Sequence, residues 1–488
     1  MQFFSTRNTD SRVSAAQAIV QGLSSEGGLF VPESFPRVDL KTACEKKSYA
    51  DLAAYVLGAM LPGYPQEFIT KATEETYGDA FQGKAGYLQP VADGLFSLEL
   101  WHGPTCAFKD YALQIMPRLL VKGKELLGRN ELTYILVATS GDTGKAALAG
   151  YQDVPGVKIA VFYPSHGTSQ VQRLQMTTQQ GDNVAVYAVN GNFDDAQTGV
   201  KKVFADQEIG KELASRNVCL SSANSINWGR LAPQIVYYFA AYRQLVERGS
   251  IQMGDPVDFC VPTGNFGDIL AGYYAKQMGL PVGRLVCASN RNNVLTEFLK
   301  TGHYDARRTF YRTTSPSMDI LVSSNLERLL YHMCEDAQKV SGWMEQLRTQ
   351  GHYQVDAQCL EKIQEVFSAG CADDEQAAAQ INEMFADNEY LCDPHTAVAF
   401  CVAQEYRKAG DAHAPMVVLS TASPFKFPGD VLKALGQKVP EDEFEAMRQL
   451  AAYTYAPAPQ ALAVLQGQKE RFDQVIEPEQ IREIAKTL

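Results

Sequence analysis

Short apolar runs alternate with longer stretches of helical spacing between residues 94 and 430, and this alternation limits the possible folds more than any other feature. Residues 132–139, 157–163 and 258–262 are apolar enough to be buried strands, and each is followed by a loop and an expected helix. Strands that alternate with helices form parallel sheets with helices on both faces. Such sheets bind ligands in the loops at the carboxyl ends of their strands, where we expect the functional site.

The length of 488 residues predicts more than one domain. We expect a mainly helical cap over residues 1–85 and a catalytic α/β region with two subdomains over residues 94–430. Residues 291–392 are more polar and mainly helical, and we interpret them as an insertion without an assigned chemical role. A helical tail is expected over residues 431–488.

Composition excludes several classes of protein. The net charge of -12 argues against a nucleic-acid binder and against a polybasic membrane surface, and no apolar run is long enough to span a bilayer. The start of the chain lacks a basic-then-apolar signal. The ten cysteines form no Cys-x-x-Cys pair and the seven histidines form no metal-binding pattern. We therefore expect a soluble cytoplasmic protein with reduced cysteines and no metal.

Lys109 is the first candidate for chemistry. It lies in Trp101–Asp110, in the first turn of an expected helix at 107–127 that follows an expected strand at 94–101 and that Pro117 interrupts. A lysine beside apolar groups such as Phe108 is costly to keep charged, so its pKa falls and its amine becomes a usable nucleophile, as Schiff-base chemistry requires. The alternative is a lysine that extends its charge to solvent from the start of a helix.

Two glycine-rich loops follow expected strands and open expected helices, at residues 140–144 and 263–267. Outward-facing backbone N–H groups and a helix N-terminus favour an anion at such loops. A nucleotide P-loop does not fit the first, because Thr139 and Ala146 occupy positions that need Gly and Ser or Thr. Two such loops suggest two anionic groups, although small residues that only tighten a turn explain the first loop equally well.

Three further stretches have both a chemical and a structural interpretation. Residues 221–230 gather hydroxyls, amides and Arg230, which suits a phosphate, but a helix cap with a solvated arginine explains them too. Asp393 suits a helix N-cap, and we interpret His395 as a hydrogen-bonded core histidine. A hydroxyl in 420–426 could meet a heteroaromatic nitrogen or cap the next turn.

Together these stretches resemble the threonine synthase family, pyridoxal-phosphate enzymes of the tryptophan-synthase-β fold type, fold type II. The resemblance covers almost the whole chain and predicts two parallel-sheet domains sandwiched by helices, with a helical N-terminal domain. The stretches that carry it are Ser5–Arg7, Gly27–Pro32, His102–Asp110, Thr139–Gly144, Asn224–Asn227, Pro262–Asp268, Asp393–Ala397 and Ser420–Ala422.

The resemblance assigns roles to residues. Lys109 is implied to form the Schiff base with pyridoxal 5'-phosphate, beside Phe108, and Thr421 to face the pyridine nitrogen. The implied phosphate loop consists of Gly264, Asn265, Phe266 and Gly267. The residues implied to bind substrate phosphate and carboxylate are Ser140, Gly141, Asp142, Thr143, Asn224, Ser225 and Arg230.

The family reaction converts O-phospho-L-homoserine and water into L-threonine and phosphate, and we expect a monomer or homodimer. Two positions depart from the family pattern: Ser423 stands where members often have His, and Asp142 where related enzymes place Asn near the cofactor's phenolic oxygen. Asp142 must then be protonated, turned away or used otherwise. A phospho-lyase that yields 2-oxobutyrate, ammonia and phosphate remains an alternative, as does a non-catalytic binder of a phosphorylated ligand.

Overall fold

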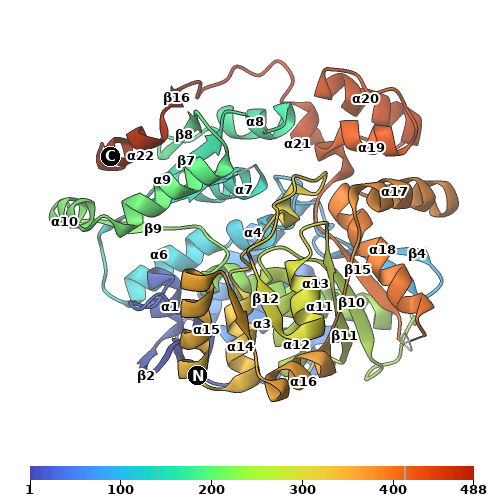
Figure 1. Cartoon of the computed structure of the whole chain (residues 1–488), viewed down its shortest axis with the longest axis horizontal. Coiled ribbons are helices and arrows are strands. Elements are labelled where there is room, and N and C mark those ends of the chain that lie inside the picture. The colour runs from blue at the N-terminus through green and yellow to red at the C-terminus, as the bar shows by residue number, and fades with distance from the viewer. Residues whose placement is uncertain (140, 167, 411–413, 488) are drawn as a thin grey trace.

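Two parallel sheets form the frame of the molecule in the computed structural model, which describes residues 1–139, 141–166, 168–410 and 414–487. The larger sheet has the strand order β14-β11-β10-β15-β5-β4, parallel except for the β4–β5 pair. Figure 1 shows it apart from the second sheet. Its strands are β4 (Tyr87–Ala92), β5 (Leu95–Glu99), β10 (Val257–Pro262), β11 (Val282–Ser289), β14 (Phe367–Cys371) and β15 (Met416–Ser420).

The second sheet is parallel throughout, in the order β16-β8-β7-β6-β9. The predicted pair of helix-covered parallel sheets is thus confirmed. The strands of the second sheet are β6 (Leu132–Ala138), β7 (Val157–Pro164), β8 (Val184–Val189), β9 (Val218–Ser221) and β16 (Val475–Ile476). The helices that accompany it are α7 (Asp142–Tyr151), α8 (Gln170–Thr177), α9 (Phe193–Ala205) and α10 (Gln207–Ser215).

Burial on both faces explains why the strands are apolar without alternation. In β6, Ile135 packs into one hydrophobic cluster and Leu136 into the cluster on the opposite face. In β10, Phe259 and Cys260 divide in the same way between two clusters. Successive side chains of a strand point to opposite faces, so a strand covered on both sides needs an apolar residue at every position.

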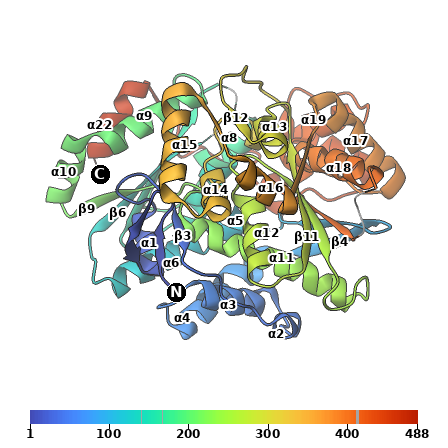
Figure 2. The same cartoon turned by 60° about the horizontal axis from the view of Figure 1, so that its bottom comes forward.

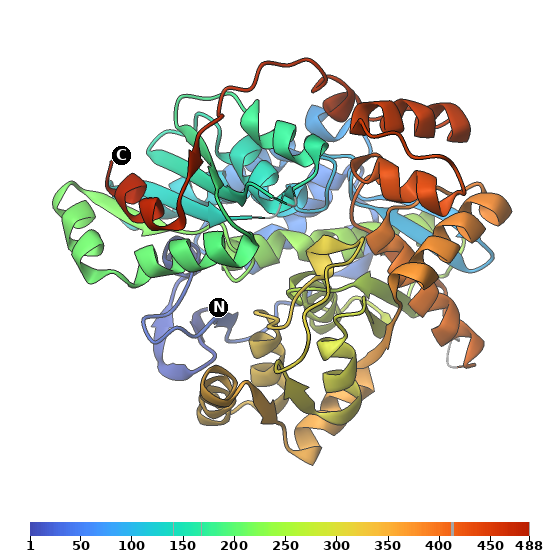
Figure 3. The same ribbon diagram turned by 45° about the horizontal axis from the view of Figure 1, so that its top comes forward.

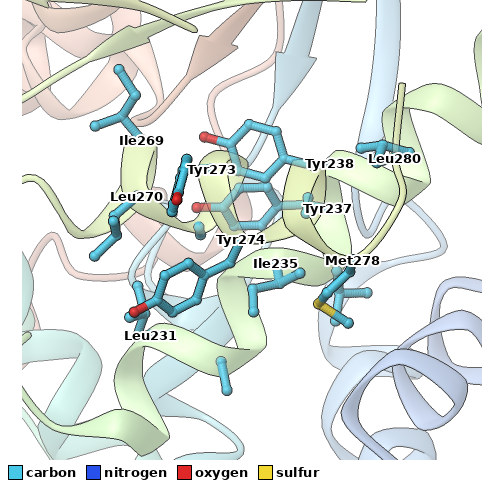
Figure 4. Packing of buried hydrophobic residues seen from close by; sticks show 14 of the residues in the cluster. Leu231, Ile235, Tyr237, Tyr238, Ile269, Leu270, Tyr273, Tyr274, Met278 and Leu280 are labelled. Carbon is cyan, nitrogen blue, oxygen red and sulfur yellow. The ribbon is translucent and has the colours of Figure 1, made fainter. Parts of the chain in front are cut away.

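Helix α11 (Trp228–Glu247) is the central helix of the larger lobe, with most of its residues buried. It packs against α12 (Gly267–Gln277), and Figure 4 shows their tyrosines and aliphatic side chains interleaved. Tyr237 and Tyr238 donate hydrogen bonds to Asp268 at the start of α12. Burying each large apolar side chain contributes about 1.5–3 kcal/mol, so this contact fixes where the N-terminus of α12 lies.

The N-terminal part combines helices with a small antiparallel sheet in the order β2-β1-β3. Figure 2 shows α2, α3 and α4 below α11, and α2 and α3 pack against α11. The elements are β1 (Phe3–Ser5), β2 (Asn8–Val13), α1 (Ala15–Gln21), β3 (Phe30–Pro32), α2 (Leu40–Cys44), α3 (Tyr49–Met60) and α4 (Gln66–Tyr77). The boundary near residue 85 stays a prediction.

The segment expected as an insertion is mainly helical and contributes β14 to the larger sheet and a two-stranded sheet, β12 with β13. The elements from residue 291 to α18 are α13 (Val294–Thr301), β12 (His303–Asp305), α14 (Leu326–Cys334), α15 (Ala337–Gln350), β13 (His352–Gln354), α16 (Ala357–Val366), β14, α17 (Asp374–Asn388) and α18 (Pro394–Lys408).

The C-terminal segment spans both lobes, and Figure 3 shows it in red crossing from one to the other. Besides helices it supplies the short strand β16, which pairs with β8, so the expected helical tail contains a strand. Its helices are α19 (Pro428–Ala434), α20 (Glu443–Thr454), α21 (Gln460–Ala463) and α22 (Ile481–Lys486). No helix among the described residues combines the length and the apolar character needed to cross a bilayer.

Candidate active site

Three loops of the larger sheet meet because their strands are neighbours. Strand β15 lies between β10 and β5, so the loops after these three parallel strands end at one edge of the sheet. The loop after β5 is fixed to the loop after β15: the Phe108 N–H donates to the Thr421 carbonyl at 2.8 Å, and Ala107 pairs with Ala422. Thr421 is therefore held beside Phe108 and Lys109, although it is far from them in sequence.

The helix expected over residues 107–127 is divided into α5 (Asp110–Leu113) and α6 (Met116–Leu126), with Pro117 in the first turn of α6. Lys109 is the residue immediately before α5 rather than a member of its first turn. A proline is well tolerated at the start of a helix, so the interruption falls just before it.

The amine of Lys109 lies in a largely buried place, with 11% of its side chain exposed. Its Nζ is 3.1 Å from Ser317 Oγ and 3.7 Å from Asp142 Oδ2, and it lies 5.2 Å from the centre of the Phe108 ring. Burial lowers the pKa of this lysine, and the charges of Lys426 and Arg230 lower it further, against the opposing charge of Asp142. A lysine with a lowered pKa is a stronger nucleophile near neutral pH.

Asp142 is the first residue of α7, one of the helices that accompany the second sheet, and its carboxylate faces Lys109. Its Oδ1 lies 2.6 Å from Lys426 Nζ and accepts a hydrogen bond from Gln172 at 3.0 Å. Burial alone raises the pKa of this carboxyl, but the ammonium groups of Lys426 and Lys109 outweigh it and hold the pKa well below its usual range. Of the three expected alternatives for Asp142, the structure favours a different use of the side chain, as a buried carboxylate that neutralises two lysines.

The loop Thr263–Gly267 leads from β10 into α12. A Cβ on Gly264 would stand 2.6 Å from the Ser317 carbonyl oxygen, so a side chain has no room there. Phe266 has a φ of +61°, which is costly for a bulky residue and typical of functional loops. Gly267 and the positive end of α12 follow at once, while Asn265 is exposed. The loop thus offers backbone N–H groups and a helix N-terminus, which suit a phosphate.

The loop that leads into α11 combines a helix cap with a buried arginine. Asn227 caps α11 by accepting from the Gly229 N–H at 2.8 Å and donates to the Ile19 carbonyl, which confirms the helix-cap interpretation for this residue. Arg230 is not solvated: it is buried, donates to the Ala223 carbonyl, and its Nε has no hydrogen-bond partner within the described part of the chain. Burial lowers its pKa to about 10, so it stays charged at neutral pH.

The remaining predicted site residues border this centre. Ser225 is half-buried and bonded to exposed Asn224 at 3.2 Å, and its Oγ lies 3.4 Å from Asn325 Nδ2, a side chain that also donates to the Asn265 carbonyl. Gly141 is buried before α7 and Thr143 is half-buried in its first turn. Ser140 lies outside the described residues.

The sequence interpretation missed two residues that touch this centre. Ser317 belongs to the segment without an assigned role, and it contacts Lys109 across 208 positions of sequence. Lys426 ends the 420–426 stretch, for which the sequence suggests only a role for a hydroxyl, and its side chain is completely buried against Asp142 and the Thr105 carbonyl. Lys426 follows the recognised Ser420–Ala422 stretch, which was a usable signal, whereas nothing in the sequence near Ser317 marks it.

His395 and Ser423 have structural partners. His395 is 2% exposed, its Nδ1 bonds to Asp393 at 2.7 Å, and its Nε2 accepts the Ser317 N–H, so the core-histidine interpretation is confirmed. Ser423 is buried, and its Oγ accepts the Phe425 N–H as a cap. Among the described residues, no three His, Cys, Asp or Glu side chains gather where they could hold a metal ion.

The donor set fits pyridoxal phosphate. The largely buried amine of Lys109 has a lowered pKa, and the buried guanidinium of Arg230, whose Nε has no partner among the described residues, is near enough to lower that pKa further. The Gly264 loop at the N-terminus of α12 is linked to the same amine through Ser317. These are the groups that an aldehyde cofactor with a phosphate needs: a nucleophile for the aldehyde and fixed positive partial charges for the anion.

Family models match nearly the whole chain. A model described as a pyridoxal-phosphate dependent enzyme matches residues 91–423. Models described as the threonine synthase N terminus and the threonine synthase C-terminal region match residues 2–77 and 396–485.

Curated relatives and solved structures agree with these models. The chain is 41% identical to a threonine synthase of Pseudomonas aeruginosa, over 90% of this chain and 91% of that protein. It is 39% identical to the human protein named threonine synthase-like 1, over 96% of this chain, and spans only 65% of that protein's length.

The structure is similar to a threonine synthase from Brucella melitensis solved with pyridoxal phosphate, with a TM-score of 0.88, 37% identity and coverage of 100% of this chain and 99% of that one. A yeast threonine synthase matches with a TM-score of 0.87 and 32% identity over 99% and 97% of the two chains. The shared fold, the shared sequence and the geometry around Lys109 agree: the chain belongs to the threonine synthase family of pyridoxal-phosphate-dependent enzymes.

Proposed function

We propose that this enzyme is a threonine synthase, which converts O-phospho-L-homoserine and water into L-threonine and phosphate. The observation that carries the proposal is the position of the Lys109 amine, largely buried and close enough to Arg230 for the guanidinium to lower its pKa. A phosphorylated amino acid needs both an amine-linked cofactor and a buried cation for its anionic groups. Similarity to threonine synthases over more than nine-tenths of the Pseudomonas protein supports the same reaction.

The proposed cofactor-binding residues are those that the family resemblance implies, and the geometry around Lys109 supports them. The backbone N–H groups of Gly264, Asn265, Phe266 and Gly267 would bind the cofactor phosphate, and Lys109 would hold its aldehyde carbon. When bound, pyridoxal phosphate supplies an electron sink that stabilises negative charge on the substrate carbons. Thr421, whose carbonyl accepts from the Phe108 N–H, would offer a neutral hydroxyl to the ring nitrogen, which would not force that nitrogen to be protonated as a carboxylate would.

The substrate-binding residues lie at the starts of α7 and α11. Arg230, Ser225 and Asn224 bind the phosphate and carboxylate, together with backbone and hydroxyl donors from Ser140, Gly141 and Thr143. With substrate bound to the cofactor, Lys109 would act as the general base that takes the proton from the α-carbon. Burial lowers the pKa of Lys109, which favours the unprotonated amine that this role needs.

Ser423 favours a second candidate function, a phospho-lyase that yields 2-oxobutyrate, ammonia and phosphate. Its hydroxyl is used as a helix cap, so this position provides neither a histidine nor a free hydroxyl to return a proton to the substrate. Release of the unsaturated product and its hydrolysis to 2-oxobutyrate and ammonia would then compete with the addition of water that gives threonine.

Product analysis separates the two functions. Purified protein with pyridoxal phosphate is incubated with O-phosphohomoserine, and phosphate, threonine and 2-oxobutyrate are measured together. Phosphate matched by threonine supports the synthase, and phosphate matched by 2-oxobutyrate supports the lyase. Retention of phosphate release in Lys109→Ala would contradict both. A Ser423→His variant that shifts products from 2-oxobutyrate to threonine would identify Ser423 as the cause of a lyase outcome.

We also propose that the enzyme acts in the cytoplasm as a monomer or homodimer. The net charge of -12 supports a partner that is a small molecule rather than nucleic acid or an anionic membrane surface. Light scattering of the loaded enzyme at micromolar concentration distinguishes monomer from homodimer.

A further inference from the structure

The irregular segment between β12 and α14 is bonded to the loop that we assign to the cofactor phosphate. Ser323 Oγ donates to the Gly264 carbonyl at 2.8 Å. The backbone N–H and the side-chain amide of Asn325 both donate to the Asn265 carbonyl, at 3.0 and 3.1 Å. The segment therefore forms part of the site rather than a surface excursion, although the sequence assigned it no role.

Ser317, in the single helical turn Pro316–Met318, contacts three parts of the site through three different groups. Its Oγ accepts from the Lys109 amine at 3.1 Å, and its N–H donates to His395 Nε2 at 3.1 Å. Its carbonyl oxygen lies against Gly264, where a Cβ would be 2.6 Å away. These contacts determine both the position of the hydroxyl and the direction in which it faces.

The contacts of His395 define its protonation. Because Nε2 accepts the Ser317 N–H, that nitrogen carries no proton, and the ring proton is on Nδ1, which donates to Asp393 Oδ1 at 2.7 Å. Asp393 is fully buried and also accepts from the Thr396 hydroxyl. His395 is therefore a neutral acceptor, held in one tautomer by a carboxylate, and it uses its second nitrogen on a backbone N–H.

We propose that Ser317 is a positioning residue for the Lys109 amine, and that Asp393 and His395 act on that amine only through Ser317. The proposal rests on the proposed role of Lys109 as the cofactor-binding lysine. A lysine amine at the end of four flexible bonds loses much conformational entropy when one geometry is selected. The Ser317 hydroxyl lies 3.1 Å from the amine, and the backbone N–H of Ser317 is bonded to the buried His395–Asp393 pair, so the amine is oriented before the cofactor binds.

The first experiment measures capture of the cofactor by unloaded protein. Pyridoxal phosphate is mixed with each variant, the rate of covalent attachment is followed by absorbance, and the attached residue is identified by borohydride reduction and mass spectrometry. In Ser317→Ala we expect attachment at Lys109 to slow by about 5–10-fold, the loss of one oriented hydrogen bond. Ser315→Ala is the matched control, because Ser315 is a buried serine of the same turn whose hydroxyl bonds to Asn290.

The second experiment tests whether His395 acts through Ser317. His395→Leu removes the acceptor, whereas His395→Gln places an amide oxygen within reach of the Ser317 N–H. We expect His395→Leu to slow attachment about as much as Ser317→Ala, His395→Gln to restore part of the rate, and the double variant Ser317→Ala/His395→Leu to be no slower than either single variant. Amine-specific labelling of Lys109 in unloaded protein, followed by mass spectrometry, gives an independent readout.

The outcomes separate the two proposals. Attachment in Ser317→Ala at the wild-type rate, or losses that add in the double variant, would overturn the positioning role while leaving Lys109 in place. Attachment at another lysine, with Lys109→Ala as fast as wild type, would instead overturn the proposed function. Equal slowing in Ser315→Ala would also overturn the proposal, because the effect would then belong to the turn and not to the hydroxyl at Lys109.

Discussion

The loops that carry Lys109 and Lys426 follow neighbouring parallel strands, β5 and β15, and both lysines face the carboxylate of Asp142. Lys426 is completely buried and bonded to Asp142 and to the Thr105 carbonyl. Lys109 is farther from the carboxylate, at 3.7 Å, and its amine donates to the neutral hydroxyl of Ser317 at 3.1 Å. Lys426 therefore acts as a structural counterion, because its amine forms a close ion pair with Asp142. Lys109 remains an available nucleophile, because its amine is farther from that carboxylate.

Replacing Lys109 should have the largest effect on chemistry and a small effect on the fold. We expect Lys109→Ala to lower the turnover rate by about 10³-fold or more, because the same amine holds the cofactor and moves the α-proton. Asp142 keeps Lys426 as a partner, so the free energy of unfolding should change by no more than about 1 kcal/mol. Product assays and urea unfolding of the unloaded protein measure both. An active Lys109→Ala would remove the contrast between the two lysines.

Replacing Lys426 should have the reverse pattern. We expect Lys426→Met to lower the free energy of unfolding by about 3–5 kcal/mol, because it leaves a buried carboxylate with a more distant cation. The pKa of Lys109 should rise, since one repelling cation is lost and Asp142 pairs with Lys109 alone. Urea unfolding and the pH dependence of Lys109 labelling measure the two effects.

Lys145→Met is the control for this experiment. Lys145 is another largely buried lysine, with a pKa lowered to about 8 by burial, but its amine binds the Gln179 amide oxygen at 2.6 Å. Lys145→Met should lower the free energy of unfolding by less than Lys426→Met does, because the carboxylate of Asp142 keeps both of its lysine partners. Equal losses in the two variants would mean that burial, and not the ion pair, determines the effect.

Asp268 is a buried carboxyl that faces tyrosines instead of a paired lysine, and it should respond to pH in the opposite direction to Asp142. Burial raises its pKa to about 7, although hydrogen bonds from Tyr237 and Tyr238 oppose the shift. Between about pH 4 and 7 the folded protein keeps a proton that the unfolded chain has lost, so this group makes stability fall as pH rises. Asp142, with a lowered pKa, stabilises the fold at neutral pH and loses that contribution only in acid.

The test is Asp268→Asn in the unloaded protein. Because the amide does not titrate, its stability relative to wild type should improve from pH 4 to pH 8 by up to about 4 kcal/mol, the value of about three pKa units. Unfolding in urea across this pH range measures the difference. A difference that does not change with pH would show that Asp268 is ionised in the folded protein at all these pH values.

The smallest effect should come from the contact between Ser317 and Gly264. Gly264→Ala puts a Cβ 2.6 Å from a backbone oxygen, which no rotamer change can relieve, so we expect a loss of about 1–3 kcal/mol and slower cofactor attachment. Gly210→Ala is the control: it lies in α10 with nothing within 4 Å of the new Cβ, and it should stabilise by about 0.5–1 kcal/mol. Gly264→Ala should change the reactivity of Lys109 and leave the Lys426–Asp142 pair unchanged. Differential labelling of the two lysines measures this.

Most of the fold and the centre of the site could be predicted from the sequence. Strand patterns identified β6, β7 and β10. The resemblance to the threonine synthase family predicted pyridoxal phosphate as the cofactor and Lys109 as the lysine that binds it. Asp142 could be noticed as a departure but not explained, because its partner Lys426 lies 284 positions away in another lobe's loop. Ser317 could not be found at all, since it lies in an irregular turn without periodicity.

Local residue pattern by itself determined which segments are strands and helices, that the sheets are parallel, and which loops could hold anions, because these depend on spacing and on residue type within short windows. Only the tertiary structure decided which loops meet. The order β10-β15-β5 brings the loops of Gly264, Thr421 and Lys109 to one edge, and the second sheet presents Asp142 to them. Strand order follows from the packing of whole elements, which no short window of sequence contains.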